Sequence, residues 1–409
     1  MKILFLSHYF PPEVNAPATR TFEHCKRWVE LGHEVTVVSC VPHHPHGRAF
    51  PGYENRWWQV EERDGIRAIK LKTYITANEG FFRRTLNYVI YMVMCILAAP
   101  FLKSADVVIS TSPQFFNGLA GYFVSRIKRC PWLLEIRDLW PESILAVGAI
   151  ENRRVIAALE AVERFVYRKA DHVVAVTEAF CPHIEQRGAA RENISLIRNG
   201  VNLDFFQHAE ADHDLAQEWG LAGKFVAAYV GTHGMAHGLD TIIEAATLLE
   251  DEPEIVFLMV GEGAERERLL ARVEELGLSN IVMQPQQPKE RMPAIWSLTD
   301  VSLVLLRKLD LFKTVIPSKI FESMAMSRPI VLGVEGEVAG IIEQSQTGIC
   351  IEPESASALA DAVLSLHRDK ALYQRLAANG RPCVSRDFDR TALADRYEKI
   401  LSGMVESAA

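Results

Sequence analysis

The sequence predicts an α/β protein with two Rossmann-like, doubly wound parallel-sheet domains. Short apolar runs rich in β-branched residues alternate with helical patterns. The runs lack the period-two alternation of half-exposed strands, which is typical of parallel strands covered on both faces. The alternation pauses near Gly200 and then restarts. A chain of 409 residues, 49% of them hydrophobic, is long enough for two cores.

The predicted strands form two series. The first comprises KILFLS, HEVTVVS, IRAIKL, DVVIST, WLLEI, HVVAVT and ISLIRNG, and the second comprises KFVAAYVG, EIVFLMVGEG, NIVMQP, VSLVLL, RPIVLG and GICIEP. The polar segment 208–218 separates the two series. We therefore expect an N-terminal domain at residues 1–200 and a C-terminal domain at 201–385. A C-terminal helix within 386–409 is expected to pack back on the first domain.

Charge and cysteine content narrow the class of protein. Net charge is −8, made up of 25 − 20 = +5 for residues 1–200 and 19 − 32 = −13 for 201–409. The basic half suits an anionic surface, whereas the acidic half argues against nucleic-acid binding. The seven cysteines have no metal-ligand spacing, which favours a reducing cytoplasm. The first apolar run is too short for a signal peptide and is expected to be a buried strand.

Ligands of doubly wound sheets bind beyond the carboxyl ends of the strands, so two facing sheets are expected to make a cleft lined by loops of both domains. The candidate residues should therefore follow strands. Five segments do so: 7–16, 137–143, 231–238, 261–263 and 316–322.

The segment PSKIFESMAM predicts a short helix beginning near Ser318, whose oxygen could accept an orphan N–H group. Its apolar side chains share one arc, while Lys319, Glu322 and Ser323 share the other. Glu322 lies one residue too far from Ser318 for a capping box. Two interpretations remain. One is a solvated Lys319–Glu322 ion pair; the other is a ligand site with Lys319 and N–H groups on phosphate and Glu322 on sugar hydroxyls.

Two further segments could carry chemistry. In EIRDLWPES, Arg137 could bind phosphate or carboxylate and Asp138 could orient a hydroxyl or accept its proton, although a structural Arg–Asp pair explains the same residues. The loop GTHGMAHG could lie against phosphates or simply connect a strand to a helix. The turn at Gly261–Gly263 is a weak signal, because such turns often serve close packing.

The histidine run PHHPHG gives little support to a metal site, because no carboxylate or thiol lies close in sequence. We expect a solvated loop with His43 and His44. The apolar segment 86–102 is marginal in length for spanning a bilayer. It predicts either a buried core helix or a helix seated in one leaflet, with Arg83 and Arg84 at the headgroups.

Over nearly its whole length the sequence resembles the retaining family four of GT-B glycosyltransferases, in the bacterial O-antigen and capsule branch that includes an N-acetylfucosamine transferase. The matching stretches are FPPEVNAPATRTFEHCKRWVELGHEVTVVSCVPHHPHG, LLEIRDLWPESILAVGAI, RNGVNLDFF, VGTHGMAHGLDTIIEAA, VGEGAERERL and PSKIFESMAMSRPIVL. The resemblance implies sugar transfer from a nucleotide diphosphate donor with retention and without a metal or other cofactor.

Residue by residue, the resemblance implies the following roles. Glu322 matches the second acid of the E-x7-E motif, which holds the donor ribose, and Ser318 and Lys319 lie where donor phosphates meet the helix. Donor nucleotide contacts are further implied for Gly231, Thr232, His233, Gly234, Gly261 and Gly263. Acceptor contacts are implied for Glu13, Asn15, His43 and His44. Asp138, Arg137 and Lys319 are the expected catalytic residues.

The expected acceptor is a saccharide on a polyprenyl diphosphate, which suits a protein held peripherally on the cytoplasmic face of the inner membrane through residues 81–103. Three departures from the family pattern stand out. Thr314 replaces the first acid of E-x7-E, Thr232 or His233 and His237 replace the usual Arg and Lys, and the usual histidine is missing from 109–112. A sugar-nucleotide epimerase and a non-catalytic binding partner are the rival hypotheses.

Overall fold

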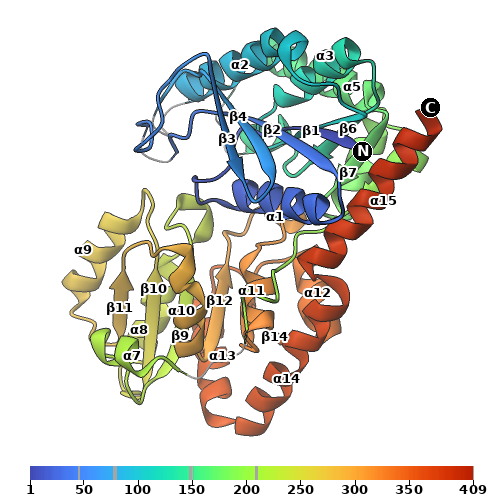
Figure 1. Ribbon diagram of the computed structural model, residues 1–409. Helices are drawn as coiled ribbons and strands as arrows, with labels where there is room; N and C mark the ends of the chain where they lie inside the picture. The colour runs from blue at the N-terminus through green and yellow to red at the C-terminus, as the bar shows by residue number, and fades with distance from the viewer. Residues whose placement is uncertain (45–46, 77–80, 147–149, 151, 208–210, 409) are drawn as a thin grey trace. The chain divides into compact units, whose positions relative to one another are not determined.

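The computed structural model describes residues 1–44, 47–76, 81–146, 150, 152–207 and 211–408, and the chain forms two compact units. Unit 1 contains residues 1–199 together with 390–409, and unit 2 contains residues 200–389. Each unit is built around a sheet of its own (Figure 1).

Unit 1 is built on an eight-stranded sheet of order β3-β4-β2-β1-β5-β6-β7-β8. Its strands are β1 (Lys2–Leu6), β2 (Glu34–Cys40), β3 (Trp58–Arg63), β4 (Ile66–Leu71), β5 (Val107–Thr111), β6 (Trp132–Ile136), β7 (His172–Ala175) and β8 (Ile194–Leu196). Every pairing is parallel except that of β3 with β4. Central strands therefore need cover on both faces.

The helices of unit 1 supply that cover. They are α1 (Ala16–Glu30), α2 (Phe81–Ala98), α3 (Asn117–Lys128), α4 (Glu142–Ala146), α5 (Arg153–Lys169), α6 (Phe180–Gln186) and α15 (Arg390–Ala408). One core cluster joins Leu4 and Leu6 of β1 to α2, α3 and α5, and a second joins Ile3 and Phe5 to α1 and α15. Figure 1 shows α2 and α1 on opposite faces of this sheet.

Unit 2 has a six-stranded parallel sheet of order β11-β10-β9-β12-β13-β14. The strands are β9 (Phe225–Val230), β10 (Ile255–Val260), β11 (Ile281–Gln284), β12 (Val301–Leu305), β13 (Ile330–Gly333) and β14 (Gly348–Cys350). One face packs on α7 (His213–Glu218), α10 (Met292–Leu298), α11 (Lys319–Ala325) and α12 (Glu337–Ser345). The other packs on α8 (Asp240–Leu248), α9 (Arg266–Leu276) and α13 (Ala356–Arg368), while α14 (Lys370–Asp387) contributes to both clusters.

Each sheet has one point where the strand order reverses, between β1 and β5 in unit 1 and between β9 and β12 in unit 2. Loops leaving two such strands diverge, and the gap between them is the usual ligand position in this class of fold. The loops concerned carry His8 and Glu13 in unit 1 and Gly231 and His233 in unit 2.

The predicted fold class is confirmed, because both sheets are Rossmann-like and helix-covered. The predicted strand runs correspond to β1, β2 and β4 to β14. Strand β3 was not predicted; its sequence WQVEER has partly exposed residues along its length, and the strand lies at the sheet edge. The predicted polar segment 208–218 includes residues 208–210, which lie outside the described residues.

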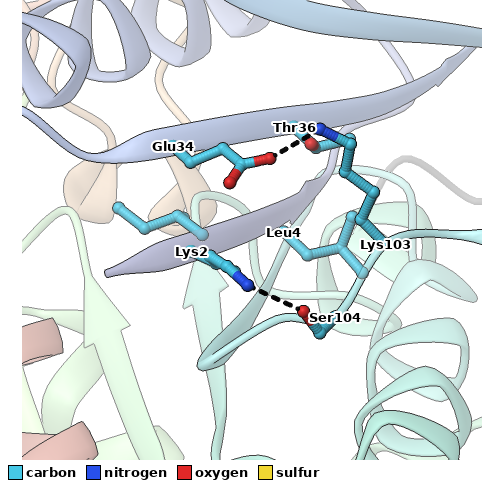
Figure 2. Close-up of a pocket in the computed structure, with 7 residues that line it drawn as sticks. Lys2, Leu4, Glu34, Thr36, Lys103 and Ser104 are labelled. Atoms are coloured by element: carbon cyan, nitrogen blue, oxygen red, sulfur yellow. Dashed lines mark hydrogen bonds and ion pairs between the residues drawn. The ribbon is translucent and has the colours of Figure 1, made fainter.

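Figure 2 shows a pocket at the amino ends of β1 and β2, which is the opposite end of the sheet from the predicted site. Its volume is about 10 Å³, so it has room for no more than one water. Lys103 Nζ lies 2.9 Å from Glu34 Oε1, and Lys2 Nζ donates to Ser104 Oγ at 3.1 Å. Lys103 therefore has an anionic partner within unit 1.

Gly380 of α14 allows that helix to approach α11. A Cβ at this position would lie 2.7 Å from the carbonyl oxygen of Met324, which is too close for backbone to tolerate. We predict that Gly380→Ala lowers the free energy of unfolding by about 1–3 kcal/mol, measured by urea unfolding. The control is Gly340→Ala in α12, where the nearest atom would be Gln344 Nε2 at 4.0 Å. That variant should be neutral or slightly more stable, and equal losses in both variants would contradict the prediction.

Candidate functional site

Lys319, the first residue of α11, lies at the strand-order reversal of unit 2. Its Nζ atom is 3.6 Å from the centroid of the Tyr229 ring and is buried without a hydrogen-bond partner. A Cβ on Gly231 would lie 2.8 Å from this Nζ, so the amine occupies the space that a side chain would take. Burial lowers the pKa of Lys319 to about 7, although the Glu322 carboxylate opposes the shift.

Two histidines of the loop after β9 flank the same tyrosine. The rings of His233 and His237 each lie 5.9 Å from the Tyr229 ring. Neither ring nitrogen of His233 has a hydrogen-bond partner, and Nδ1 of His237 also lacks one. Burial lowers the pKa of both histidines to about 4, and the positive charge of Lys319 adds to the shift. Both imidazoles are therefore neutral near pH 7, with polar atoms available to a ligand.

Glu322 does not form the solvated ion pair with Lys319 that was the first of the two interpretations of this helix. Its Oε2 accepts a hydrogen bond from Trp296 Nε1 at 3.2 Å, whereas Lys319 Nζ has no hydrogen-bond partner. The polar arc predicted for this helix is not solvated at Ser323, which is fully buried and donates to Ser302 Oγ at 2.7 Å. Ser318 occupies the N-cap position, but its side chain makes no capping hydrogen bond, contrary to expectation.

Gly261 and Gly263 are glycines because two loops touch there. His233 N donates to Glu262 O at 2.9 Å, and Glu265 N donates to His233 O at 2.9 Å. A Cβ on Gly261 would lie 1.8 Å from Gly231 O, and one on Gly263 would lie 2.3 Å from His233 O. The structure thus gives both glycines a packing role, which shapes the loop that carries the histidines. Tyr229 also fixes this loop, because its hydroxyl donates to Thr232 O at 2.8 Å.

Thr314 stands where the resemblance places an acid, and its hydroxyl is used locally. Thr314 Oγ1 donates to Leu311 O at 2.8 Å. The neighbouring Lys313 pairs with Asp310 at 2.8 Å and with Glu335 at 3.2 Å.

In unit 1, Arg137 and Asp138 follow β6 but their side chains have different partners. Asp138 Oδ2 accepts from Ser143 Oγ at 3.1 Å, and burial raises the pKa of this carboxyl. Arg137 instead interacts electrostatically with Glu135 and Arg20, and its Nε and Nη1 are buried without hydrogen-bond partners. Among the described residues no ion pair joins Arg137 to Asp138. The suggested structural pair is therefore not formed, and the two side chains do not share a partner.

Arg20 and Glu135 form a buried ion pair beneath these residues. Arg20 Nη2 lies 2.9 Å from Glu135 Oε1, and the two side chains are 3% and 1% exposed. Arg20 also donates to the carbonyls of Ile197 and Arg198 at 2.9 and 2.8 Å. The pair therefore joins α1, β6 and the segment after β8.

Glu13 organises the histidine loop and is itself buried, with 3% of its surface exposed. Its Oε1 accepts from the backbone N–H groups of His43 and His44, both at 3.0 Å. Burial raises the pKa of Glu13 to about 7, although these hydrogen bonds and the Lys70 charge oppose the shift. The expectation of a solvated loop was wrong for His43, which is 4% exposed. The third histidine, His46, lies outside the described residues.

A small polar pocket beside this loop contains residues that the sequence analysis did not find. It has a volume of about 20 Å³ and is lined by His8, Tyr9, His43, His44, Thr76, Arg84, Asn87 and Tyr88. Asn87 links its walls, because it bonds to His8 Nε2 at 2.7 Å and His43 Nε2 at 3.2 Å. Asn15 is placed differently, since its Oδ1 caps α1 by accepting from Ala18 N at 2.9 Å.

No cluster of three His, Cys, Asp or Glu side chains with metal-binding arrangement occurs in the part of the chain that the structure describes.

Two Rossmann-like sheets, with candidate residues at their strand-order reversals, define the structural class of this protein. Residues 15–200 match the family described as "Glycosyl transferase 4-like domain", and residues 213–382 match "Glycosyl transferases group 1". The fold is that of the GT-B glycosyltransferases, and each unit contains a segment that matches a glycosyl transferase domain family.

Individual proteins are similar over almost the full chain. WcaI of Escherichia coli (strain K12), a glycosyl transferase provisionally assigned to colanic acid biosynthesis, is 27% identical over 98% of this chain and 100% of its own. Sucrose-phosphate synthase from Thermosynechococcus elongatus superposes with a TM-score of 0.80 at 19% identity, covering 99% of both chains. HepE of Anabaena, in complex with UDP and glucose, gives 0.72 at 19% identity, covering 98% of this chain and 99% of its own.

Glu13 should make stability depend on pH. Its folded-state pKa, about 7, lies above the ordinary value of 4.5, so the folded protein binds the extra proton and loses stability as pH rises through this interval. We predict that Glu13→Gln gains about 1–3 kcal/mol relative to wild type between pH 5 and pH 8, measured by urea unfolding. Exposed Glu192 is the control. Glu192→Gln should follow the wild-type pH profile, and a Glu13→Gln profile parallel to wild type would contradict the prediction.

Proposed function

We propose that the protein is a retaining, metal-independent glycosyltransferase that moves a sugar from a nucleotide diphosphate donor to a polyprenyl-diphosphate-linked saccharide in surface polysaccharide synthesis. The observation that carries the proposal is the group of unpartnered polar atoms on Lys319, His233 and His237 at the strand-order reversal of unit 2. Such a group suits a buried anionic ligand. The likeness to WcaI supports the polysaccharide context, and an N-acetylated deoxyhexose is the proposed sugar.

On the donor side, Lys319 and the two histidines are the proposed contacts of the diphosphate. Glu322, oriented by Trp296, is the proposed ligand of the ribose hydroxyls, and the Ser318 hydroxyl, which makes no capping bond, is available to phosphate. Gly231 to Gly234 and Gly261 to Gly263 shape the loops around the nucleotide. Because Thr314 bonds to its own turn, the donor sugar must be held by other groups.

On the acceptor side, Asp138 is the proposed partner of the acceptor hydroxyl, and Glu13, Asn15, His43 and His44 shape the adjacent loops. In the proposed reaction the bond between the sugar anomeric carbon and the phosphate oxygen breaks first. The acceptor oxygen then bonds to the same face of that carbon, and its proton passes to the departing phosphate. Arg137 acts through the charged cluster with Glu135 that supports the loop.

Membrane attachment is proposed through α2 and the turn that follows it. Apolar side chains remain exposed along this segment: Val93 is 41%, Leu97 55% and Phe101 80% exposed, at intervals of four residues. Neighbouring α3 adds exposed Phe123 and Ile127. By length and composition Arg83–Phe101 could also cross a membrane, as core helices of many soluble proteins could, and 39% of that window is buried. A peripheral position on the cytoplasmic face is the proposal.

Activity is tested by incubating the protein with UDP, GDP, ADP and dTDP sugars and a polyprenyl-diphosphate-linked saccharide. We expect acceptor-linked product whose new bond keeps the donor's anomeric configuration, insensitivity to EDTA, and a loss of about 10²-fold or more in kcat for Asp138→Asn. Release of nucleotide without linked product would contradict the proposal. An altered sugar nucleotide formed without acceptor would indicate the epimerase, and binding without turnover the non-catalytic partner.

Membrane attachment is tested by sedimentation with vesicles containing phosphatidylglycerol. The double variant Leu97→Ser, Phe101→Ser should bind about tenfold or more weakly, because each apolar side chain contributes about 1.5–3 kcal/mol when fully buried. Leu248→Ser in α8 is the matched control, since Leu248 is 58% exposed and lies in unit 2. Equal binding of wild type and the double variant would show that α2 does not attach the protein.

A further inference from the structure

Lys319 has few groups that could stabilise a positive charge. The ionisable groups around it are Glu322 on its own helix, Tyr229 on β9, and His233 and His237 in the following loop. Arg266 of α9 also acts on His233, but it is paired with Glu262 at 3.5 Å. Glu322 is the one acid of this set, and its Oε2 accepts from Trp296.

The geometry leaves the amine dry. Its Nζ is buried without a hydrogen-bond partner, the Tyr229 ring covers one side, and Gly231 lies so close on another that a Cβ there would be 2.8 Å from Nζ. An aromatic face stabilises an ammonium ion only partly. An ammonium has three N–H donors, and leaving them unpaired in a dry site is costly. A neutral amine satisfies this environment better than an ammonium does.

We infer that donor binding brings a proton into the site: Lys319 is a neutral amine before the nucleotide binds and becomes the ammonium that holds the diphosphate. The inference rests on the proposed function, because it requires a diphosphate at this position. The proton comes from solvent, adds to the amine lone pair, and returns to solvent when the nucleoside diphosphate leaves. No other bond changes in this step.

The histidines do not explain such an uptake above neutral pH. Their pKa values of about 4 lie far below that range, so the ligand would have to raise them by several units. The pKa of Lys319, about 7, lies at the lower edge of that range. Above pH 7 the affinity should therefore fall by up to about tenfold per pH unit, as one proton is taken up for each nucleotide bound.

Calorimetry measures this uptake directly. UDP, GDP, ADP and dTDP are titrated at pH 8 in buffers that differ in ionisation enthalpy, and each nucleotide that binds is repeated at pH 7 and pH 9. The terminal phosphate, whose pKa is about 6, is already ionised at pH 8. We expect uptake of about 0.5–1 proton per bound nucleotide at pH 8 and a weaker affinity at pH 9.

Variants assign the uptake to one residue. Lys319→Arg carries its charge at every pH, so binding should persist without uptake and with little pH dependence between 7 and 9. Lys319→Met should bind at least about tenfold more weakly and take up no proton. His237→Asn is the comparison: it removes a proposed phosphate contact and should weaken binding, but each nucleotide that binds should still bring its proton at pH 8. Circular dichroism and thermal unfolding check that each variant is folded.

The outcomes separate the two proposals. If none of the four nucleotides binds, the proposed function is overturned along with the inference. If a nucleotide binds to wild type without proton uptake at pH 8, or if Lys319→Arg keeps the uptake, the inference alone is overturned.

Discussion

The burial of the Lys319 amine against Tyr229 is the interaction on which the candidate site of unit 2 depends. It requires a glycine at 231, because any Cβ there would meet the amine. That glycine belongs to a loop that touches the next loop so closely that Gly261 and Gly263 must also lack side chains. Below, Ser323 bonds to Ser302 of β12 and fixes α11 to the sheet. The buried amine thus constrains residue 231, while close packing of the two loops constrains residues 261 and 263.

Unit 1 depends on a different buried charge. The Arg20–Glu135 pair is almost fully desolvated, and such pairs are retained only when further hydrogen bonds satisfy the charged groups. Arg20 supplies them by donating to carbonyls of the segment after β8. The negative charge of Glu135 in turn supports Arg137, whose own guanidinium lacks two hydrogen-bond partners. Arg137 therefore belongs to the buried charge cluster of Arg20 and Glu135, while Asp138 accepts from Ser143.

The sheets could be predicted because a parallel strand must bury both faces, which leaves an uninterrupted apolar run in the sequence. The edge strand β3 could not, since an exposed edge needs no such run. In the site, Lys319 and Glu322 could be found from their spacing and their place after a strand. Tyr229, Trp296 and Asn87 could not, because their roles come from packing between distant segments, which leaves no local pattern. The Gly-x-Gly turn is the opposite case. Its pattern is visible in the sequence, but in the structure it reflects the close packing of two loops.

The departures from the family pattern fit together once the charge of Lys319 is considered. An arginine keeps its charge at any accessible pH, so a clamp of permanent cations needs acids or water nearby when no ligand is bound. Here the loop positions hold neutral histidines, and the cation is a lysine, whose charge burial can remove. The empty site can then be dry and closely packed without carrying an unpaired charge. The diphosphate supplies the negative charge that makes the ammonium favourable, so the Lys319 amine takes up its proton when the ligand binds.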